Sequence, residues 1–260
     1  MRTLVMGILN VTPDSFSDGG RYNSVAQAVQ RVEEMIAEGV DIVDVGGYST
    51  RPGYQEVSVA EELARVIPVV QAIRQFDVLI SVDTFRSEVA AAALSAGADF
   101  INDQWAGKYD KAMFDAAARH NAQIILMHNA EEEVTGDVMA AMTEDLLRQA
   151  ELAEQAGIQR EHIWLDPGIG FAKSREQEIE VMRRLDELCG LGYKVLLATS
   201  RKRMVKELLD DGRPAAARDE GTAATTVWGI AKGIHAVRVH NVAMNKKVAR
   251  VADGLRGNNG

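Results

Sequence analysis

Short apolar runs alternate with amphipathic, helix-forming stretches along the whole chain, and this alternation limits the fold more than any other feature of the sequence. Most of the apolar runs are about four to seven residues long and lack polar alternation, which is typical of strands buried on both faces of a parallel sheet. The predicted strands are Thr3–Leu9, Ile42–Val45, Val78–Val82, Phe100–Ile101, Gln123–Met127, Ile163–Leu165, Val195–Ala198 and Ala236–Val239. The predicted helices are Val25–Ala37, Val59–Gln75, Ser87–Ala96, Lys111–His120, Asp137–Gln155, Glu176–Leu188, Lys202–Leu209, Thr222–Lys232 and Val242–Leu255.

Eight strands alternating with about as many helices in a chain of 260 residues predict a single α/β domain over residues 1–260 with the (β/α)8 TIM barrel fold. Glycines such as Gly39 and Gly97 stand where a helix should end before the next strand, which supports the alternation. An open, doubly wound sheet is the alternative. No Gly-x-Gly-x-x-Gly follows the first strand, which weakens the dinucleotide-binding form of that alternative.

The composition argues against several classes of partner. Lys and Arg total 29 against 38 Asp and Glu, and the net charge of −9 disfavours nucleic acid, because a phosphate backbone calls for clustered positive charge. The single cysteine, Cys189, excludes an intrachain disulfide and a Cys-based zinc site. No apolar stretch reaches the roughly 18 residues of a membrane helix, so no membrane partner is expected. The apolar run after Arg2 lacks the cleavage site of a signal peptide, and we therefore expect a cytoplasmic protein.

Every predicted strand exit carries a polar or ionisable group. In a barrel of this type the active site is built from the loops after the carboxyl ends of the strands. The residues at these positions are Asn10, Gly46–Gly53, Asp83, Thr84, Asn102, Asp103, His128, Asn129, Asp166–Gly168, Ser200–Lys202 and Arg238–His240. Ordinary surface loops are also polar, but they do not place the polar residue so regularly at the strand end. The pattern therefore predicts a functional rim.

Several of these residues lie in motifs that resemble those of the dihydropteroate synthases. The motifs are Met6–Gly20, Gly47–Gly53, Ser81–Thr84, Ile101–Asp103, Asp166–Phe171 and Ser200–Lys202, in the order in which the family carries them. The segments most similar to the staphylococcal and enterococcal branch are Gln104–Gly107, Ala198–Arg203 and Arg238–Asn241. The resemblance extends from about Leu4 to the last helix.

The resemblance implies a (β/α)8 barrel that forms a homodimer, and a transferase of folate biosynthesis that sulfonamides target. Members of this family condense 6-hydroxymethyl-7,8-dihydropterin diphosphate with 4-aminobenzoate and release diphosphate. Their two small-molecule substrates are implied as the partners of this chain, and Mg²⁺ as its cofactor.

The resemblance also assigns residues to the pterin. Asp166, Asp83 and Asn102 are implied to bind the pterin edge, where a carboxylate can accept from an amino group and a ring N–H together. Lys202 is implied to donate to acceptor atoms of the pterin. Arg238 is implied to stack on the ring, for which a planar, delocalised cation is well suited.

A second group of residues is implied to bind the diphosphate and the arylamine. Thr50, Arg51 and His240 can donate to anionic oxygens, beside the free N–H groups at the start of the last helix. Asn10 is implied to contact Mg²⁺, which keeps much of its hydration. The residues implied to form the aminobenzoate pocket, on loops that close over the site, are Phe16, Ser17, Thr50 and Arg51. We expect Arg51, Lys202 and His240 to act in catalysis, and pterin diphosphate to bind first.

Structural alternatives exist for several of these residues. Asp166 and Asp83 could be N-caps of the helices that follow them. The segment Ser200–Arg203 could be a solvated basic face at a helix start, and His240 a packed loop histidine. His128 could equally be a ligand at the rim or a structural residue.

Some positions depart from the common family pattern. Ala172 stands where many members have Gly, Gln177-Glu178 where many have His-Asn, and Arg203 where many have Ser. Arg203 therefore leaves the contact to the aminobenzoate carboxylate open. Asn241 stands where many have Asp, and it can cap the last helix while removing a negative charge beside the anion.

Three other functions compete with this interpretation. A pterin-binding methyltransferase barrel would share the pterin pocket, but it has no need of the phosphate-facing residues around Arg51 and His240. An aldolase could use Lys202 to form a Schiff base. A non-catalytic pterin-binding protein would bind its ligand without releasing diphosphate.

Overall fold

The computed structural model describes residues 2–11, 21–48, 57–210, 212 and 214–257. Four predicted site residues, Phe16, Ser17, Thr50 and Arg51, lie outside the described residues.

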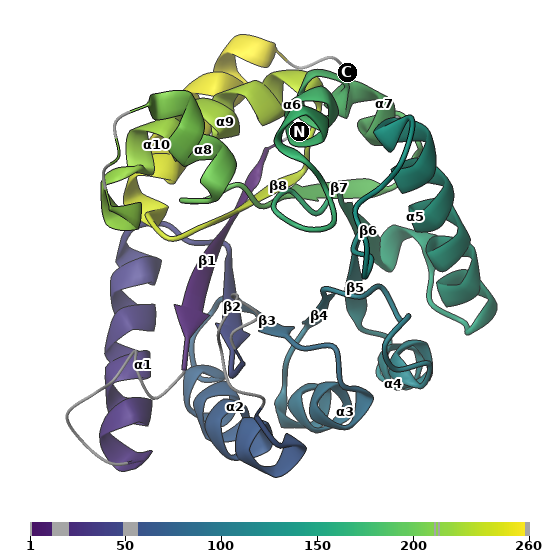
Figure 1. The fold of residues 1–260 in the computed structure, drawn as a ribbon. Coiled ribbons are helices and arrows are strands. Elements are labelled where there is room, and N and C mark those ends of the chain that lie inside the picture. The colour runs from purple at the N-terminus through teal and green to yellow at the C-terminus, as the bar shows by residue number, and fades with distance from the viewer. Residues whose placement is uncertain (1, 12–20, 49–56, 211, 213, 258–260) are drawn as a thin grey trace.

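Eight parallel strands close into a barrel in sequence order, with β8 hydrogen-bonded to β1 (Figure 1). The strands are β1 (Leu4–Asn10), β2 (Ile42–Gly46), β3 (Leu79–Asp83), β4 (Phe100–Asp103), β5 (Gln123–Met127), β6 (Ile163–Asp166), β7 (Lys194–Leu197) and β8 (Ala236–Val239). The helices surround them: α1 (Arg21–Ala37), α2 (Val59–Ile73), α3 (Ser87–Ala96), α4 (Met113–Arg119), α5 (Val138–Gln155), α6 (Arg175–Arg183), α7 (Leu185–Cys189), α8 (Arg203–Leu209), α9 (Asp219–Lys232) and α10 (Val242–Arg256). The predicted (β/α)8 barrel is confirmed, and the open sheet is excluded.

The interior of the barrel has two levels of opposite character. Its lower level is a separate apolar cluster, here called the floor, made of Met6, Ile42, Phe100, Ile125, Trp164, Leu196 and Ala236. Side chains along a strand alternate between faces, so the next inward-facing residue stands two positions further on. Two positions after Ile42, Phe100, Trp164 and Ala236 stand Asp44, Asn102, Asp166 and Arg238. The level above the floor therefore carries polar or charged side chains on β2, β4, β6 and β8. The larger apolar core lies between the sheet and the helices.

The observed strand ends differ from the predicted ones in a consistent way. β1, β2, β3, β4 and β6 each run on by one or two residues and end on the polar residue that was expected in the loop, or on a glycine in β2. The reason is backbone pairing: Gly46 is in register with Asn10 on one side and with Asp83 on the other. The polar side chains of the rim are therefore fixed by the sheet itself.

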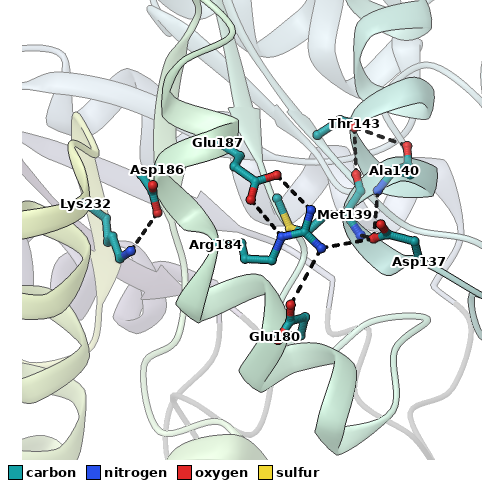
Figure 2. A network of polar contacts seen from close by, with 9 residues as sticks. All are labelled: Asp137, Met139, Ala140, Thr143, Glu180, Arg184, Asp186, Glu187 and Lys232. Atoms are coloured by element: carbon teal, nitrogen blue, oxygen red, sulfur yellow. Dashed lines mark hydrogen bonds and ion pairs between the residues drawn. The ribbon is translucent and has the colours of Figure 1, made fainter.

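The predicted helix over 176–188 is interrupted. Arg184 leaves the helical region with φ −101° and ψ 20°, and it separates α6 from α7. Its guanidinium group bridges Glu187 of α7, Glu180 of α6 and Asp137, the N-cap of α5 (Figure 2). Lys232 of α9 pairs with Asp186 in the same view. These contacts are solvent-exposed, so they tie the outer helices together weakly.

Across the described ranges, none of the helices has both the length and the apolar composition that a membrane span requires.

Candidate active site

The polar level of the barrel interior opens at the carboxyl ends of the strands. Asp83 of β3 and Asn102 of β4 are directly paired in register, and Asp166 of β6 pairs with Met127 of β5. Asp83, Asn102 and Asp166 are all buried. The barrel thus brings together the residues that the sequence predicted for one binding site, and we call this region the mouth.

Arg238 of β8 is held on the inner wall by two carboxylates. Its Nε donates to Asp44 Oδ2 at 2.6 Å, and its Nη2 donates to Asp83 Oδ2 at 2.7 Å. Burial alone would lower the pKa of this guanidinium, but the two carboxylates outweigh burial and raise it. Arg238 therefore stays charged, and its plane is fixed by bonds along one edge.

Asp44 also belongs to this wall, and the sequence had not indicated it. It is fully buried on β2, and its Oδ2 also accepts from Nδ2 of Asn102 at 3.3 Å. A carboxylate can only accept, so this contact fixes which end of the Asn102 amide faces β2. An acidic residue inside the otherwise apolar run Ile42–Val45 was the signal that could have revealed it, because a buried charge needs a partner.

Asp83 does not cap α3. The N-cap position of that helix is Arg86, and the backbone N–H of Ser87 donates instead to Asp110. Asp83 accepts from Gln104 Nε2 at 2.7 Å as well as from Arg238. Burial raises its pKa to about 6, although the charge of Arg238 opposes that rise. The capping alternative is wrong, and the side chain belongs to the mouth.

Asp166 does not cap a helix either. The N-cap of α6 is Ser174, which forms a capping box with Gln177. Asp166 Oδ1 accepts from the backbone N–H of Gly168 at 2.7 Å, and this bond holds its own loop. Burial raises the pKa of the carboxyl, while the nearby charge of Lys202 opposes the rise.

Lys202 turns inward from the N-cap of α8. Its Nζ donates to the carbonyl of Ile169 at 2.5 Å and lies 4.9 Å from the centre of the Phe171 ring. Burial lowers its pKa to about 8, and Asp166 partly offsets this effect. Its neighbour Arg203 does lie on an exposed helix face, with a side chain 65% exposed. The solvated-face alternative therefore holds for Arg203 and fails for Lys202.

Arg201 points away from the mouth. It has a positive φ of 60° and pairs with Asp219 through two bonds of 2.7 and 2.9 Å.

His240 follows β8 and is held by Ser200, a residue to which the sequence analysis gave no role. Ser200 Oγ accepts from the backbone N–H of His240 at 3.1 Å and lies 2.9 Å from its Nδ1. When that hydroxyl donates to Nδ1, the ring proton sits on Nε2. The next residue, Asn241, accepts from the N–H of Met244 at 3.0 Å, so the predicted cap of the last helix is confirmed.

Asn10 stands at the end of β1, beside the mouth. Its Oδ1 lies 3.6 Å from the point where a Cβ on Gly46 would stand. Among the described residues, no cluster of three His, Cys, Asp or Glu side chains could hold a metal ion. An amide oxygen is a suitable ligand for a hydrated Mg²⁺ that takes its other oxygens from water and from a phosphate group. The donors present fit such an ion, and they fit no metal held by protein ligands alone.

The chemistry of the mouth suits a flat, nitrogen-rich ring. Carboxylate and amide oxygens can accept from N–H groups on the ring edge, and a lysine can donate to its acceptor atoms. A fixed guanidinium plane offers a stacking surface.

Comparisons with known proteins agree with this chemistry. Residues 6–240 match the family model described as pterin binding enzyme. A dihydropteroate synthase of Staphylococcus haemolyticus is 60% identical over 257 residues, which cover 99% of this chain and 96% of that protein. The Clostridium difficile dihydropteroate synthase, solved in the presence of pteroic acid, is 45% identical with a TM-score of 0.94 and covers 98% of this chain and 97% of its own. The Xanthomonas albilineans enzyme, solved with 4-aminobenzoic acid, is 40% identical with a TM-score of 0.93 over 98% and 94% of the two chains.

Proposed function

The chain belongs to the dihydropteroate synthase family of pterin binding enzymes, and from this premise we propose how its residues divide the work. It is a transferase of folate biosynthesis that condenses 6-hydroxymethyl-7,8-dihydropterin diphosphate with 4-aminobenzoate to 7,8-dihydropteroate and diphosphate. The observation that carries the assignment of the site is the convergence of Asp166, Asn102, Lys202 and Arg238 at one end of the barrel.

The pterin lies in the mouth. Asp166 and Asn102 accept from its amino group and ring N–H groups, and Lys202 donates to its acceptor atoms. Arg238, with its guanidinium plane fixed by Asp44 and Asp83, stacks on the ring. Because these groups are already oriented by protein hydrogen bonds, binding costs little reorganisation.

The reaction breaks the bond between the pterin methylene carbon and the diphosphate oxygen and forms a bond from that carbon to the arylamine nitrogen. The diphosphate leaves with the bonding electron pair, and the nitrogen loses its proton after attack. Arg51, Thr50 and His240 stabilise the charge that develops on the departing oxygens. The weakly basic amine then attacks a methylene cation that the pterin ring stabilises. Positioning and charge stabilisation carry the catalysis, and no covalent enzyme intermediate is needed.

Mg²⁺ is the proposed cofactor, and Asn10 is its one protein ligand among the described residues. When bound, the ion would neutralise charge on the diphosphate. Binding is ordered, because loops that carry Phe16 and Arg51 complete the aminobenzoate pocket after the pterin diphosphate is in place.

A homodimer is the proposed assembly. An apolar groove of about 360 Å³ lies between α6, α8 and α9, and Met182, Met204 and Trp228 are among the residues that line it. Leu208 and Trp228 at this groove are 62% and 47% exposed. Exposed apolar surface of this kind marks protein interfaces, and a second copy of the chain is the occupant we propose. We also propose a cytoplasmic location, with which the single, partly buried thiol of Cys189 is compatible: its partial burial raises its pKa to about 11.

The purified protein tests this function directly when it is given both substrates and Mg²⁺. We expect 7,8-dihydropteroate and diphosphate in equal amounts, and no product from the pterin alcohol that lacks diphosphate. Pterin binding without release of diphosphate would instead favour a non-catalytic pterin-binding protein. Covalent trapping of Lys202 by borohydride with a carbonyl substrate would favour the aldolase alternative.

A further inference from the structure

Two buried basic side chains behind the β6–α6 loop contact each other and have no role in the function described so far. Lys173 Nζ lies 2.7 Å from Nδ1 of His128. Each of the two residues is only 3% exposed. His128 directly follows β5, and Lys173 immediately precedes Ser174, the N-cap of α6. The contact therefore joins two neighbouring strand exits of the barrel.

The same amino group also holds the backbone of its own loop. Lys173 Nζ lies 3.3 Å from the carbonyl oxygen of Gly168 and 3.3 Å from that of Phe171. Between these two carbonyls stands Ile169, whose carbonyl accepts from Lys202. The ring of Phe171 also lies against the Nζ of Lys202. Lys173 thus spans the segment that supports Lys202 from below.

The segment has an uncommon backbone that gains from such a support. Gly168 and Gly170 have φ values of 67° and 91°, and Ala172, which carries a Cβ, has a φ of 48°. That conformation is strained for a residue with a Cβ. A Cβ at Gly168 would lie 2.0 Å from the carbonyl oxygen of His128, so the two loops are in direct backbone contact. The backbone N–H of His128 donates in turn to the carbonyl of Asp166 at 2.9 Å.

The hydrogen bond between Lys173 and His128 can form whether the amino group of Lys173 is charged or neutral. Burial and the charge of Lys173 lower the pKa of His128 to about 3, so its ring is neutral near pH 7. Burial lowers the pKa of Lys173 to about 7, although Asp166 opposes this. A charged Lys173 donates three N–H groups to Nδ1 and to the two carbonyls. A neutral Lys173 donates two to the carbonyls and accepts from Nδ1–H of the other histidine tautomer.

We propose that Lys173 and His128 are a pair of positioning residues for the pterin site: they fix the β6–α6 loop in the shape that aims Asp166 and Lys202 into the mouth. The pair touches no substrate itself. This inference rests on the proposed function, because it is the pterin that Asp166 and Lys202 are held to meet. It also answers the question that the sequence left open for His128: the residue binds no ligand, but it supports the loop that orients the ligand-binding residues.

Calorimetric titration with 6-hydroxymethylpterin, a pterin without phosphates, tests the pair at a temperature well below the melting point of each variant. Lys173→Met removes the amino group, and His128→Leu removes the ring nitrogen. We expect each to weaken pterin binding more than fivefold, and the double variant to bind no worse than the weaker single one, because both remove the same contact. His128→Asn keeps a polar group near the position of Nδ1 and should stay within fivefold of the wild type.

Two controls separate positioning from general damage. Lys108→Met removes a lysine that also bonds the loop after β5, through Asn129 O at 2.5 Å and Asp145 at 2.6 Å, but makes no bond to the β6–α6 loop. Its pterin affinity should stay within fivefold of the wild type. Titration with inorganic diphosphate should give the wild-type affinity in every variant, since the residues proposed for that group stand elsewhere.

The proposal is overturned if Lys173→Met and His128→Leu bind the pterin within fivefold of the wild type, or if Lys108→Met loses as much. It is equally overturned if diphosphate affinity falls in step with pterin affinity. Should Lys173→Met fail to fold, the comparison of His128→Leu with His128→Asn decides alone. If the wild-type protein forms 7,8-dihydropteroate but the variants keep the wild-type pterin affinity, the positioning role of Lys173 and His128 is refuted. The proposed function is not affected by that result.

Discussion

The floor and the mouth of the barrel are built on the same strands, two residues apart, and they solve opposite problems. The floor packs Phe100 against Trp164, with ring centroids 5.8 Å apart, and excludes water. The mouth buries carboxylates and cations that folding alone would not favour, because each must be taken out of water. Stability therefore depends mainly on the floor, and ligand recognition on the mouth. Substitutions in the floor should lower the free energy of unfolding, whereas substitutions in the mouth should lower ligand affinity.

The largest expected effect lies in the floor. Phe100→Ala should lower the free energy of unfolding by about 3–5 kcal/mol, because it removes a fully packed aromatic ring and leaves a cavity. Denaturant titration measures this loss, and pterin affinity measured on the folded fraction should stay unchanged. A variant of normal stability with weak pterin binding would break the distinction between the two levels.

The phosphate side of the mouth should show a smaller effect than the floor. Arg51→Ala and His240→Ala should each weaken binding of inorganic diphosphate tenfold or more, since each 1.4 kcal/mol lost is about tenfold. Turnover should fall with it, while the affinity for a pterin without phosphates stays near that of the wild type. Calorimetry with both ligands and thermal melting separate this outcome from a structural one, in which all ligands weaken alike.

A smaller loss should follow from Asp44→Asn. The amide oxygen can still accept from Arg238, but the substitution removes one of the two negative charges that compensate the buried guanidinium. We expect pterin binding to weaken by about threefold to tenfold although residue 44 touches no ligand. If calorimetry shows normal affinity and only the melting temperature falls, Asp44 belongs with the floor.

The smallest effect should come from the outer surface. Arg184→Met removes the exposed ion pairs that join α5, α6 and α7 (Figure 2). Such pairs contribute about 0–1 kcal/mol, so unfolding and turnover should both stay close to the wild type. A loss above about 2 kcal/mol in denaturant titration would show that the helical shell, and not only the floor, sets the stability.

Much of this arrangement was accessible from the sequence because it depends on periodicity and position. The apolar runs fixed the number and order of strands, and strand-end placement located Asp83, Asn102, Asp166 and Arg238 at one rim. The helix caps were partly predicted as well, since Asn241 caps α10 as expected.

What the sequence could not supply depends on side-chain partners. Asp44 was hidden in an apolar run, and its importance appears only when Arg238 from β8 meets it across the barrel. Ser200 gained its role from His240, 40 residues further along the chain. The break at Arg184 was missed because its helical pattern continues through it, and only the dihedral angles show the interruption.

The central claim is that the mouth recognises the pterin through Asp166, and the pterin affinity of Asp166→Asn tests it most directly. The substitution keeps the shape of the side chain but replaces one acceptor oxygen by a donor. Charge-assisted hydrogen bonds are worth about 1.5–3 kcal/mol each, so we predict a loss of roughly 100-fold in calorimetry with a pterin analogue, with little change in melting temperature. Near-normal affinity in a folded Asp166→Asn variant would contradict the account.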